Sequence, residues 1–120
     1  MDKYSKFYYN GKSSVYELLI YKSNNGKAPF DKWFSSIKDK KTRLIVQARI
    51  DRAVLGNLGD VKGLGDDVFE FRINFGPGYR LYFSIQDRKI LLLLVGGDKR
   101  TQNKDIDKAK LYLKDWKENG

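Results

Sequence analysis

The sequence predicts an α+β fold, a single small domain in which helices pack on one face of an antiparallel sheet. Polar and apolar residues alternate along about Val68–Phe75 and again along Gly78–Gln86, with a Gly-Pro-Gly turn between the two runs. Such alternation is typical of paired strands that bury one face. Apolar residues recur at helical spacing in two stretches before these strands and in one stretch after them. Helices that are grouped around the strands, rather than alternating with them, favour this fold class.

The expected elements follow the order β-α-α-β-β-β-α. A first strand covers Val15–Lys22 and ends in a Ser-Asn-Asn-Gly turn. A proline suits the first turn of a short helix over about Pro29–Lys38. A second helix covers about Lys41–Leu55, and a glycine-rich loop separates it from the paired strands. The aliphatic run Lys89–Gly96 is the last strand, and a final helix covers about Lys104–Lys117.

The second helix is predicted to bury an apolar side and to expose a basic one. Its expected core residues are Leu44, Ile45, Ala48, Val54 and Leu55. The basic residues expected at its start and on its outer surface are Lys40, Lys41, Arg43, Arg49 and Arg52. A basic surface of this kind is normally solvated, and it also attracts RNA.

The two paired strands place different residue types on their two faces. Because side chains alternate, one face is apolar, and it carries Phe69, Phe71, Ile73, Phe75, Tyr79, Leu81, Phe83 and Ile85. The opposite face carries Glu70, Arg72, Arg80 and Tyr82. Guanidinium groups bind phosphate oxygens through paired hydrogen bonds, so arginines on an open sheet face suit a phosphate-bearing partner. Tyr82 on this open face is positioned to stack on an RNA base.

Composition limits the classes of function. A chain of 120 residues forms one domain, with residues 1–14 expected to be a flexible N-terminal arm and residues 15–120 the folded domain. The formal net charge of +9 favours an acidic partner, either nucleic acid or an acidic protein. Because the chain has no cysteine and no histidine, we expect no disulfide, no thiolate chemistry and no transition-metal site. No apolar run is long enough to span a bilayer and no signal peptide is visible, so we expect a cytoplasmic protein.

An ordered set of short motifs marks the second half of the chain. The motifs are Lys62-Gly63-Leu64, Val68 to Arg72, Gly78 to Phe83, Leu93 to Lys99, and Gln102 with Asp105-Ile106. In this order and spacing they resemble the RelE/ParE superfamily of bacterial toxins, and most closely its HigB-like, phage Gp49-like addiction module killer proteins. The likeness covers roughly Val15–Trp116, and it implies a RelE-like arrangement of the α+β fold.

The resemblance also implies a set of site residues. The family places a phosphate-binding arginine directly after a Gly-Tyr pair, which is Arg80 here. The candidate catalytic residues are Arg80, Arg72, Lys99 and Glu70. The candidate RNA-binding residues are Lys62, Tyr82, Arg100 and Gln102. Four of these have structural alternatives. Arg72 can form an ion pair with Glu70 or Asp67, and Gln102 can simply begin the last helix. Arg80 and Lys62 can be solvated charges on a strand and in a loop. The glycines before Lys99 are expected to let the backbone approach a ligand closely.

The function that the resemblance implies is the toxin component of a type II toxin–antitoxin system. The toxin would be a ribosome-dependent endoribonuclease that cleaves messenger RNA without a metal or cofactor. Its expected partners are a helix-turn-helix antitoxin, the ribosome and messenger RNA. The alternatives are a ParE-like inhibitor of DNA gyrase and a degenerate relative that only binds. Positions that hold tyrosine or histidine in several ribonuclease members hold Asp105 and Ile106 here, so the general acid and base remain open.

Overall fold

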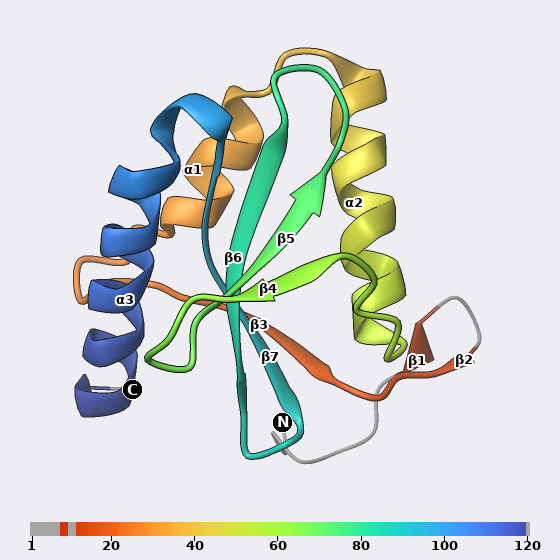
Figure 1. The fold of residues 1–120 in the computed structure, drawn as a ribbon. Helices are drawn as coiled ribbons and strands as arrows, with labels where there is room; N and C mark the ends of the chain where they lie inside the picture. Colours follow the sequence, from red (N-terminus) through yellow and green to blue (C-terminus); the bar gives the residue numbers. More distant parts are fainter. Residues whose placement is uncertain (1–7, 10–11, 120) are drawn as a thin grey trace.

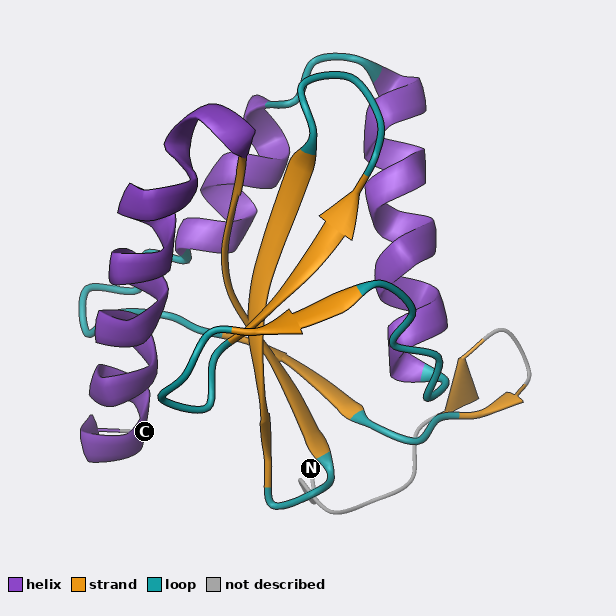
Figure 2. Cartoon of the chain, in the orientation of Figure 1, coloured by secondary structure: helices purple, strands orange, loops and turns teal. Residues whose placement is uncertain are grey.

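A five-stranded mixed sheet occupies the centre of the molecule, and helices cover both of its faces (Figures 1 and 2). The computed structural model describes residues 8–9 and 12–119. Its elements in chain order are β1 (Tyr8–Tyr9), β2 (Lys12–Ser13), β3 (Glu17–Ile20), α1 (Pro29–Ser36), α2 (Lys40–Val54), β4 (Val61–Gly63), β5 (Phe69–Ile73), β6 (Tyr79–Gln86), β7 (Ile90–Asp98), the 3-10 turn η1 (Lys99–Thr101) and α3 (Gln102–Asn119). The predicted α+β class is confirmed.

The strand order in the sheet is β3-β7-β6-β5-β4. Four of the strands form an antiparallel series, but β3 pairs with β7 in parallel. The expectation of a purely antiparallel sheet is therefore wrong at this edge. The short strand β4 lies in the segment that was expected to be only a glycine-rich loop. Within the predicted N-terminal arm, β1 and β2 pair as a small separate ribbon, and residues 1–7 and 10–11 of that arm lie outside the described part of the chain.

The helices divide between the two faces of the sheet, so the prediction that they pack on one face is wrong. One core cluster joins Phe30 of α1 and Val46 of α2 to the aromatic face of β5 and β6. A second cluster joins Ala109 and Leu113 of α3 to the opposite face. The reason lies in β7, whose residues from Ile90 to Val95 are all buried, and those from Ile90 to Leu94 alternate between the two clusters. A strand that is apolar on both sides needs cover on both sides.

The predicted alternation of β5 and β6 is confirmed. Phe71, Ile73, Leu81 and Phe83 all belong to the core under α1 and α2. The rings of Phe71 and Phe83 stack with their centroids 4.0 Å apart, and this fixes the register of the two strands on their apolar side. The polar residues between them therefore point toward the face that α3 partly covers.

A β-bulge interrupts the pairing of β6 and β7. Tyr82 lies opposite Val95 and Phe83 lies opposite Leu93, so Leu94 is an extra residue on β7. Leu94 and Val95 consequently both pack in the core under α3. Beyond the bulge, Gly96 faces α1 and Gly97 faces α3. A Cβ on Gly96 would lie 2.2 Å from the Trp33 ring, and a Cβ on Gly97 would lie 1.9 Å from Oδ2 of Asp105.

Helix α2 is rotated relative to the prediction. Leu44, expected in the core, is 60% exposed, whereas Arg49, expected on the outer surface, is only 6% exposed. The Arg49 guanidinium lies 4.4 Å from the centroid of the Phe71 ring and donates hydrogen bonds to the backbone oxygens of Leu58 and Asp60. Arg49 thus ties the segment before β4 to the core, a role that the charge of an arginine conceals in the sequence.

Arg49→Met is expected to lower the free energy of unfolding by about 1–3 kcal/mol, because methionine keeps an apolar stem but leaves the partly buried carbonyl of Leu58 without its donor. The carbonyl of Asp60 loses one of its two donors and keeps the backbone nitrogen of Arg72. Urea denaturation measures the change through its midpoint. Arg52→Met on the exposed side of the same helix is the control, with an expected change within about 0.5 kcal/mol. Equal midpoints for the two variants would contradict the role assigned to Arg49.

None of the helices in the described part of the chain has the length and apolar character that crossing a bilayer requires.

Candidate anion-binding site

The register of the sheet gathers the predicted site residues on one face. Lys62 of β4 lies opposite Glu70 of β5, which in turn lies opposite Tyr82 of β6. Two residues farther along β5, Arg72 lies opposite Arg80 of β6. Directly opposed residues, and residues two apart on one strand, point to the same face. The predicted meeting of Glu70, Arg72, Arg80 and Tyr82 on one face is therefore confirmed, and β4 adds Lys62 to it.

Glu70 lies at the centre of this group and is fully buried. Its Oε1 accepts a hydrogen bond of 3.1 Å from Nε of Arg72, and Nε of Arg80 lies 4.0 Å away from the same oxygen. Its Oε2 accepts a hydrogen bond of 2.8 Å from Nε2 of Gln102 in the first turn of α3. The carboxylate therefore connects two strands of the sheet to the start of the last helix.

The surroundings of Glu70 keep it ionised. Burial alone would raise the pKa of this carboxyl, but hydrogen bonds from Gln102 and Arg72 outweigh burial and hold the pKa below its ordinary value. A carboxylate with a lowered pKa and occupied oxygens is a weak proton acceptor. Glu70 is better suited to orient the guanidinium groups of Arg72 and Arg80 beside it.

Arg80 is not on an open face, and that expectation is wrong. Its side chain is only 10% exposed, and α3 packs against β6 on this side of the sheet. Nη1 donates a hydrogen bond of 3.1 Å to the backbone oxygen of Tyr79, while Nε is buried without a hydrogen-bond partner in the described residues. The buried Nε faces Glu70, so an incoming anion can meet only the small exposed part of the Arg80 side chain. In this partly enclosed place an anion interacts more strongly than in open solvent.

The predicted stacking of Tyr82 on an RNA base is contradicted by its burial, since its exposed fraction is 0%. Tyr82 packs in the core under α3 with Leu92 and Leu94. Burial, followed by the negative charge of Glu70, raises the pKa of its hydroxyl. The hydroxyl consequently stays protonated and lies beyond the reach of a bound nucleic acid.

Lys99 joins Arg80 where β7 leads into η1. A Cβ placed on Gly78 would lie 3.4 Å from Nη1 of Arg80 and 3.6 Å from Cβ of Lys99, so both residues border the same glycine. Gly78 has a φ of +79°, a conformation that favours glycine and brings the turn close to both side chains. The predicted closeness of Arg80, Arg72 and Lys99 is thus confirmed, with Lys99 exposed to solvent.

Arg100 is exposed, but its guanidinium is already engaged. Asp98, which caps η1, accepts hydrogen bonds from Nη2 of Arg100 at 3.0 Å and from its backbone nitrogen at 2.8 Å. An RNA phosphate would have to compete with the Asp98 carboxylate for the guanidinium group of Arg100. Gln102 is half-buried, and its side-chain amide donates a hydrogen bond to Glu70. It therefore both begins α3 and helps to hold the Glu70 carboxylate in place.

On the two faces of the sheet, Gly96 and Gly97 leave no room for a ligand, contrary to expectation. Their missing side chains are replaced by the protein itself, by the Trp33 ring on one face and by Asp105 on the other. They let two helices approach the end of β7 closely.

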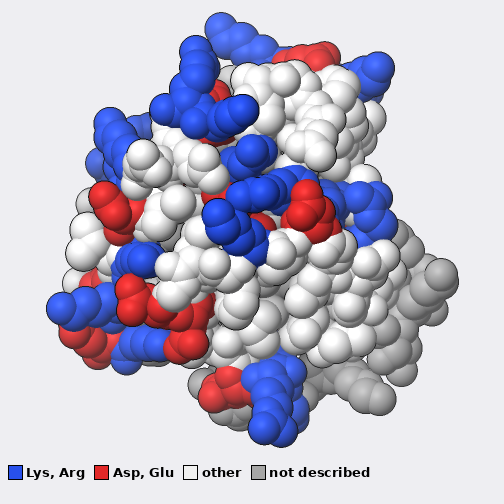
Figure 3. Space-filling view, viewed as in Figure 1, with Lys and Arg blue, Asp and Glu red and all other residues white. Residues whose placement is uncertain are grey.

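Exposed positive charge lies near the candidate anion-binding site. Figure 3 shows Lys and Arg side chains gathered over the middle of the molecule, in the region of β4 and β5. Lys62 and Lys99 are exposed, and the Arg72 side chain is 35% exposed. Arg72 and Arg80 lie beside the Glu70 carboxylate, Lys62 lies opposite Glu70 on β4, and Lys99 borders the same glycine as Arg80. These four cations outnumber the one carboxylate that the two arginines contact, so positive charge is left to hold an anion.

Asp105, in the first turn of α3, is a buried polar residue that was not among the predicted site residues. It is 6% exposed, its Oδ2 accepts a hydrogen bond of 2.5 Å from Oγ1 of Thr101, and burial raises its pKa. A signal was present in the sequence, because Asp105, Ala109 and Leu113 recur every four residues and therefore share the buried side of the helix.

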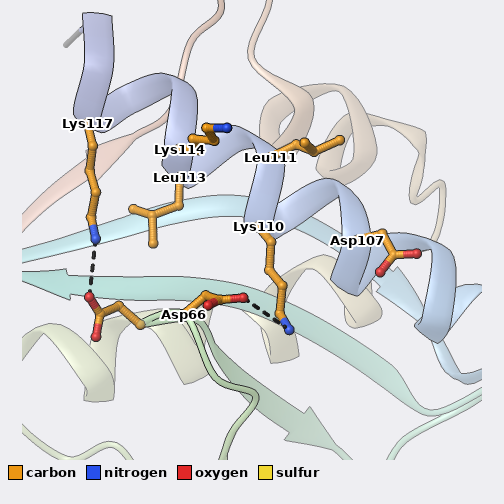
Figure 4. Close-up of a pocket in the computed structure, with 8 residues that line it drawn as sticks. Asp66, Asp107, Lys110, Leu111, Leu113, Lys114 and Lys117 are labelled. Carbon is orange, nitrogen blue, oxygen red and sulfur yellow. Dashed lines mark hydrogen bonds and ion pairs between the residues drawn. The ribbon is translucent and has the colours of Figure 1, made fainter.

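A groove between α3 and the loop before β5 differs in charge from the candidate anion-binding site (Figure 4). Lys110 lies 3.5 Å from Asp66, and Lys117 lies 3.2 Å from Asp67. Both aspartates adopt left-handed backbone conformations, with φ of 54° and 63°. These exposed pairs fasten the loop before β5 to α3 and neutralise the charge of the groove.

Comparison with known proteins gives one informative match. No family model matches the chain. An uncharacterized protein of Haemophilus influenzae is 45% identical to it over 86 residues, which make up 72% of this chain and 87% of the Haemophilus protein.

Proposed function

The chain belongs to the same family as this Haemophilus influenzae protein, and we propose that it is a RelE/ParE-type toxin that cleaves messenger RNA on the ribosome. The observation that supports the proposal is the gathering of cations near buried Glu70, with Arg72 and Arg80 beside its carboxylate, Lys62 opposite it on β4 and Lys99 next to Arg80. The motifs that hold these side chains are those on which the resemblance to HigB-like toxins rests.

The chemistry that suits this group is an internal attack within RNA. A ribose 2′-oxygen forms a bond to the adjacent phosphorus while the bond from phosphorus to the 5′-oxygen breaks, which gives a 2′,3′-cyclic phosphate and a 5′-hydroxyl. The proton of the 2′-hydroxyl passes to water, and water supplies a proton to the departing 5′-oxygen. Negative charge builds on the phosphate oxygens in the transition state, where fixed guanidinium donors stabilise it most. Arg80 and Arg72 take this role, with Lys99 and Lys62 binding the flanking phosphates.

Glu70 serves this reaction by holding the arginine forks. A carboxylate that receives hydrogen bonds from Arg72 and Gln102 is a better orienting group than a proton acceptor. In this function the chain supplies charge and orientation, and ribosomal RNA helps to position the message.

The partners that this function requires are the ribosome, messenger RNA and a helix-turn-helix antitoxin. The expected location is the cytoplasm, where all three are found. No cofactor enters the proposed reaction.

A second candidate is a ParE-like inhibitor of DNA gyrase. It is favoured by one specific observation, the shortage of groups suited to proton transfer: the sequence has no histidine, and Tyr82 is buried with a raised pKa. The same basic surface would then bind an acidic region of gyrase or its DNA.

Induced expression in a bacterium tests the proposal. We expect growth arrest, new 5′ ends within translated messages by primer extension, and rescue by an antitoxin expressed from the adjacent gene. A purified supercoiling assay run on the same protein separates the two candidates. Growth arrest with intact messages and inhibited supercoiling would establish the gyrase alternative, and normal growth with soluble protein would indicate a degenerate relative.

A further inference from the structure

A cleft lies between α1 and α3, apart from the candidate anion-binding site. It is a cleft of about 750 Å³ at the end of β7, bordered by Val95 and Gly96. The cleft exists because β3 is short: it pairs with β7 only from Ile90 to Leu93, while β7 continues to Asp98. None of Glu70, Arg72 or Arg80 lines this cleft.

Aromatic side chains form two walls of the cleft. Trp33 of α1 is fixed by its contact with Gly96 and by an edge-on contact with the Tyr79 ring, 6.2 Å between centroids. Tyr112 of α3 is held by stacking on Tyr21, with centroids 5.0 Å apart and an angle of 19° between the rings. Both Trp33 and Tyr112 are partly exposed. Rigid, partly exposed aromatic rings are the surfaces on which nucleobases stack.

Three lysines stand around the cleft. Lys27 and Lys32 come from the α1 side and Lys108 comes from α3. No described carboxylate forms an ion pair with any of the three. The cleft therefore has positive charge available for a phosphate group close to its aromatic walls.

The floor of the cleft offers hydrogen-bonding groups of both kinds. The Asp105 carboxyl lines it, with one oxygen bonded to Thr101. The β7 backbone beyond Leu93 has no strand beside it on this edge in the described part of the chain. Base edges carry donors and acceptors in one plane, and unpaired strand edges and carboxylates match them.

We propose that this cleft binds a nucleotide, with its base between Trp33 and Tyr112 and its phosphate on Lys27, Lys32 and Lys108. The nucleotide is either free or part of an RNA strand, since the chemistry of recognition is the same. This site goes beyond the proposed cleavage function and does not depend on it.

The test uses the full chain with Trp116→Phe, so that Trp33 is the one remaining tryptophan. Guanosine and adenosine monophosphate, ribose 5-phosphate, a single-stranded RNA hexamer and a glutamate hexapeptide are titrated separately. Trp33 fluorescence, corrected for absorption, and the amide resonance of Gly96 report binding. We expect both nucleotides to move both signals, and ribose 5-phosphate to bind at least about tenfold more weakly because it has no base to stack.

Surface variants keep the test independent of folding. Lys27→Ala with Lys32→Ala is expected to weaken nucleotide binding about tenfold, as charge-assisted phosphate contacts are lost. Lys38→Ala, an exposed lysine outside the cleft, is the matched control and should bind like the parent. Tighter binding of the hexamer than of the mononucleotides would assign the cleft to RNA, and equal binding would assign it to free nucleotides.

Three results would overturn the inference: equal binding of ribose 5-phosphate, quenching without a shift of Gly96, or tighter binding of the glutamate peptide. The last would identify a peptide groove instead. No ribosome takes part in these titrations, so a chain that binds nucleotides but leaves messages intact would refute only the cleavage function.

Discussion

Arg80→Lys is expected to lower ribosome-dependent cleavage by about 100-fold or more, the loss seen when one donor to a developing negative charge is removed. Lysine keeps the positive charge, but it is a single point of charge and cannot supply the two parallel donors of the guanidinium fork. The change is designed around the burial of Arg80. Alanine would remove a buried stem and leave Glu70 with fewer cations, so lost folding would be confused with lost catalysis.

The measurement is single-turnover cleavage of a programmed ribosome, with a thermal melt of each preparation. Arg88→Lys in the exposed turn before β7 is the control and should cleave like the parent. A folded Arg80→Lys protein that cleaves at the parental rate would remove Arg80 from the proposed catalytic role.

Glu70→Ala is expected to lower the free energy of unfolding by about 3–5 kcal/mol, the range found when one member of a buried ion pair is removed. The variant leaves Gln102 without an acceptor and places Arg72 opposite Arg80 with no carboxylate between them. Urea denaturation at pH 7 measures this loss. A midpoint equal to that of the parent would mean that the contacts of Glu70 contribute nothing to the fold.

The pH dependence of the unfolding free energy distinguishes the stabilising effect of the Glu70 charge from that of its side-chain shape. Because the pKa of Glu70 is lower in the folded chain than its ordinary value of 4.5, its stabilising effect is complete above pH 4.5. The effect is lost as the pH falls through the folded-state pKa. Glu70→Gln cannot ionise, so its unfolding free energy should decrease less than that of the parent between pH 6 and pH 3. Parallel curves would show that Glu70 does not contribute to acid unfolding.

Glu70→Gln should also cleave messenger RNA more slowly than the parent while still binding ribosomes.

The side-chain alternation of the two central strands was predictable, and so was the grouping of the site residues. The period of two in β5 and β6 depends only on local backbone geometry, which the sequence reports directly. The cover over that face was harder to predict. Glu70, Arg72 and Arg80 give it a polar pattern that looks solvated, yet α3 returns over part of it and buries Arg80 and Tyr82.

One signal in the sequence did point to this cover. The unbroken aliphatic run of β7 indicates burial on both faces, which requires helices on both sides of the sheet. The parallel pairing of β3 and the rotation of α2 had no such signal. Strand partners far apart in sequence depend on tertiary contacts, and a buried arginine such as Arg49 has the composition of a surface residue.

The pairing of β3 with β7 also sets the order in which the molecule can be completed. Glu17 is among the first sheet residues to be synthesised, yet its partner Ile90 comes after both of the first two helices and all of the other strands of the sheet. Such a distant pairing closes a long loop, whose entropy must be overcome before the contacts compensate for it. The bond from Gln102 to Glu70 forms later still, because α3 follows β7. A chain emerging from the ribosome therefore has an unpaired first strand and an unfinished site, and activity of the proposed kind would begin only after the whole chain is released.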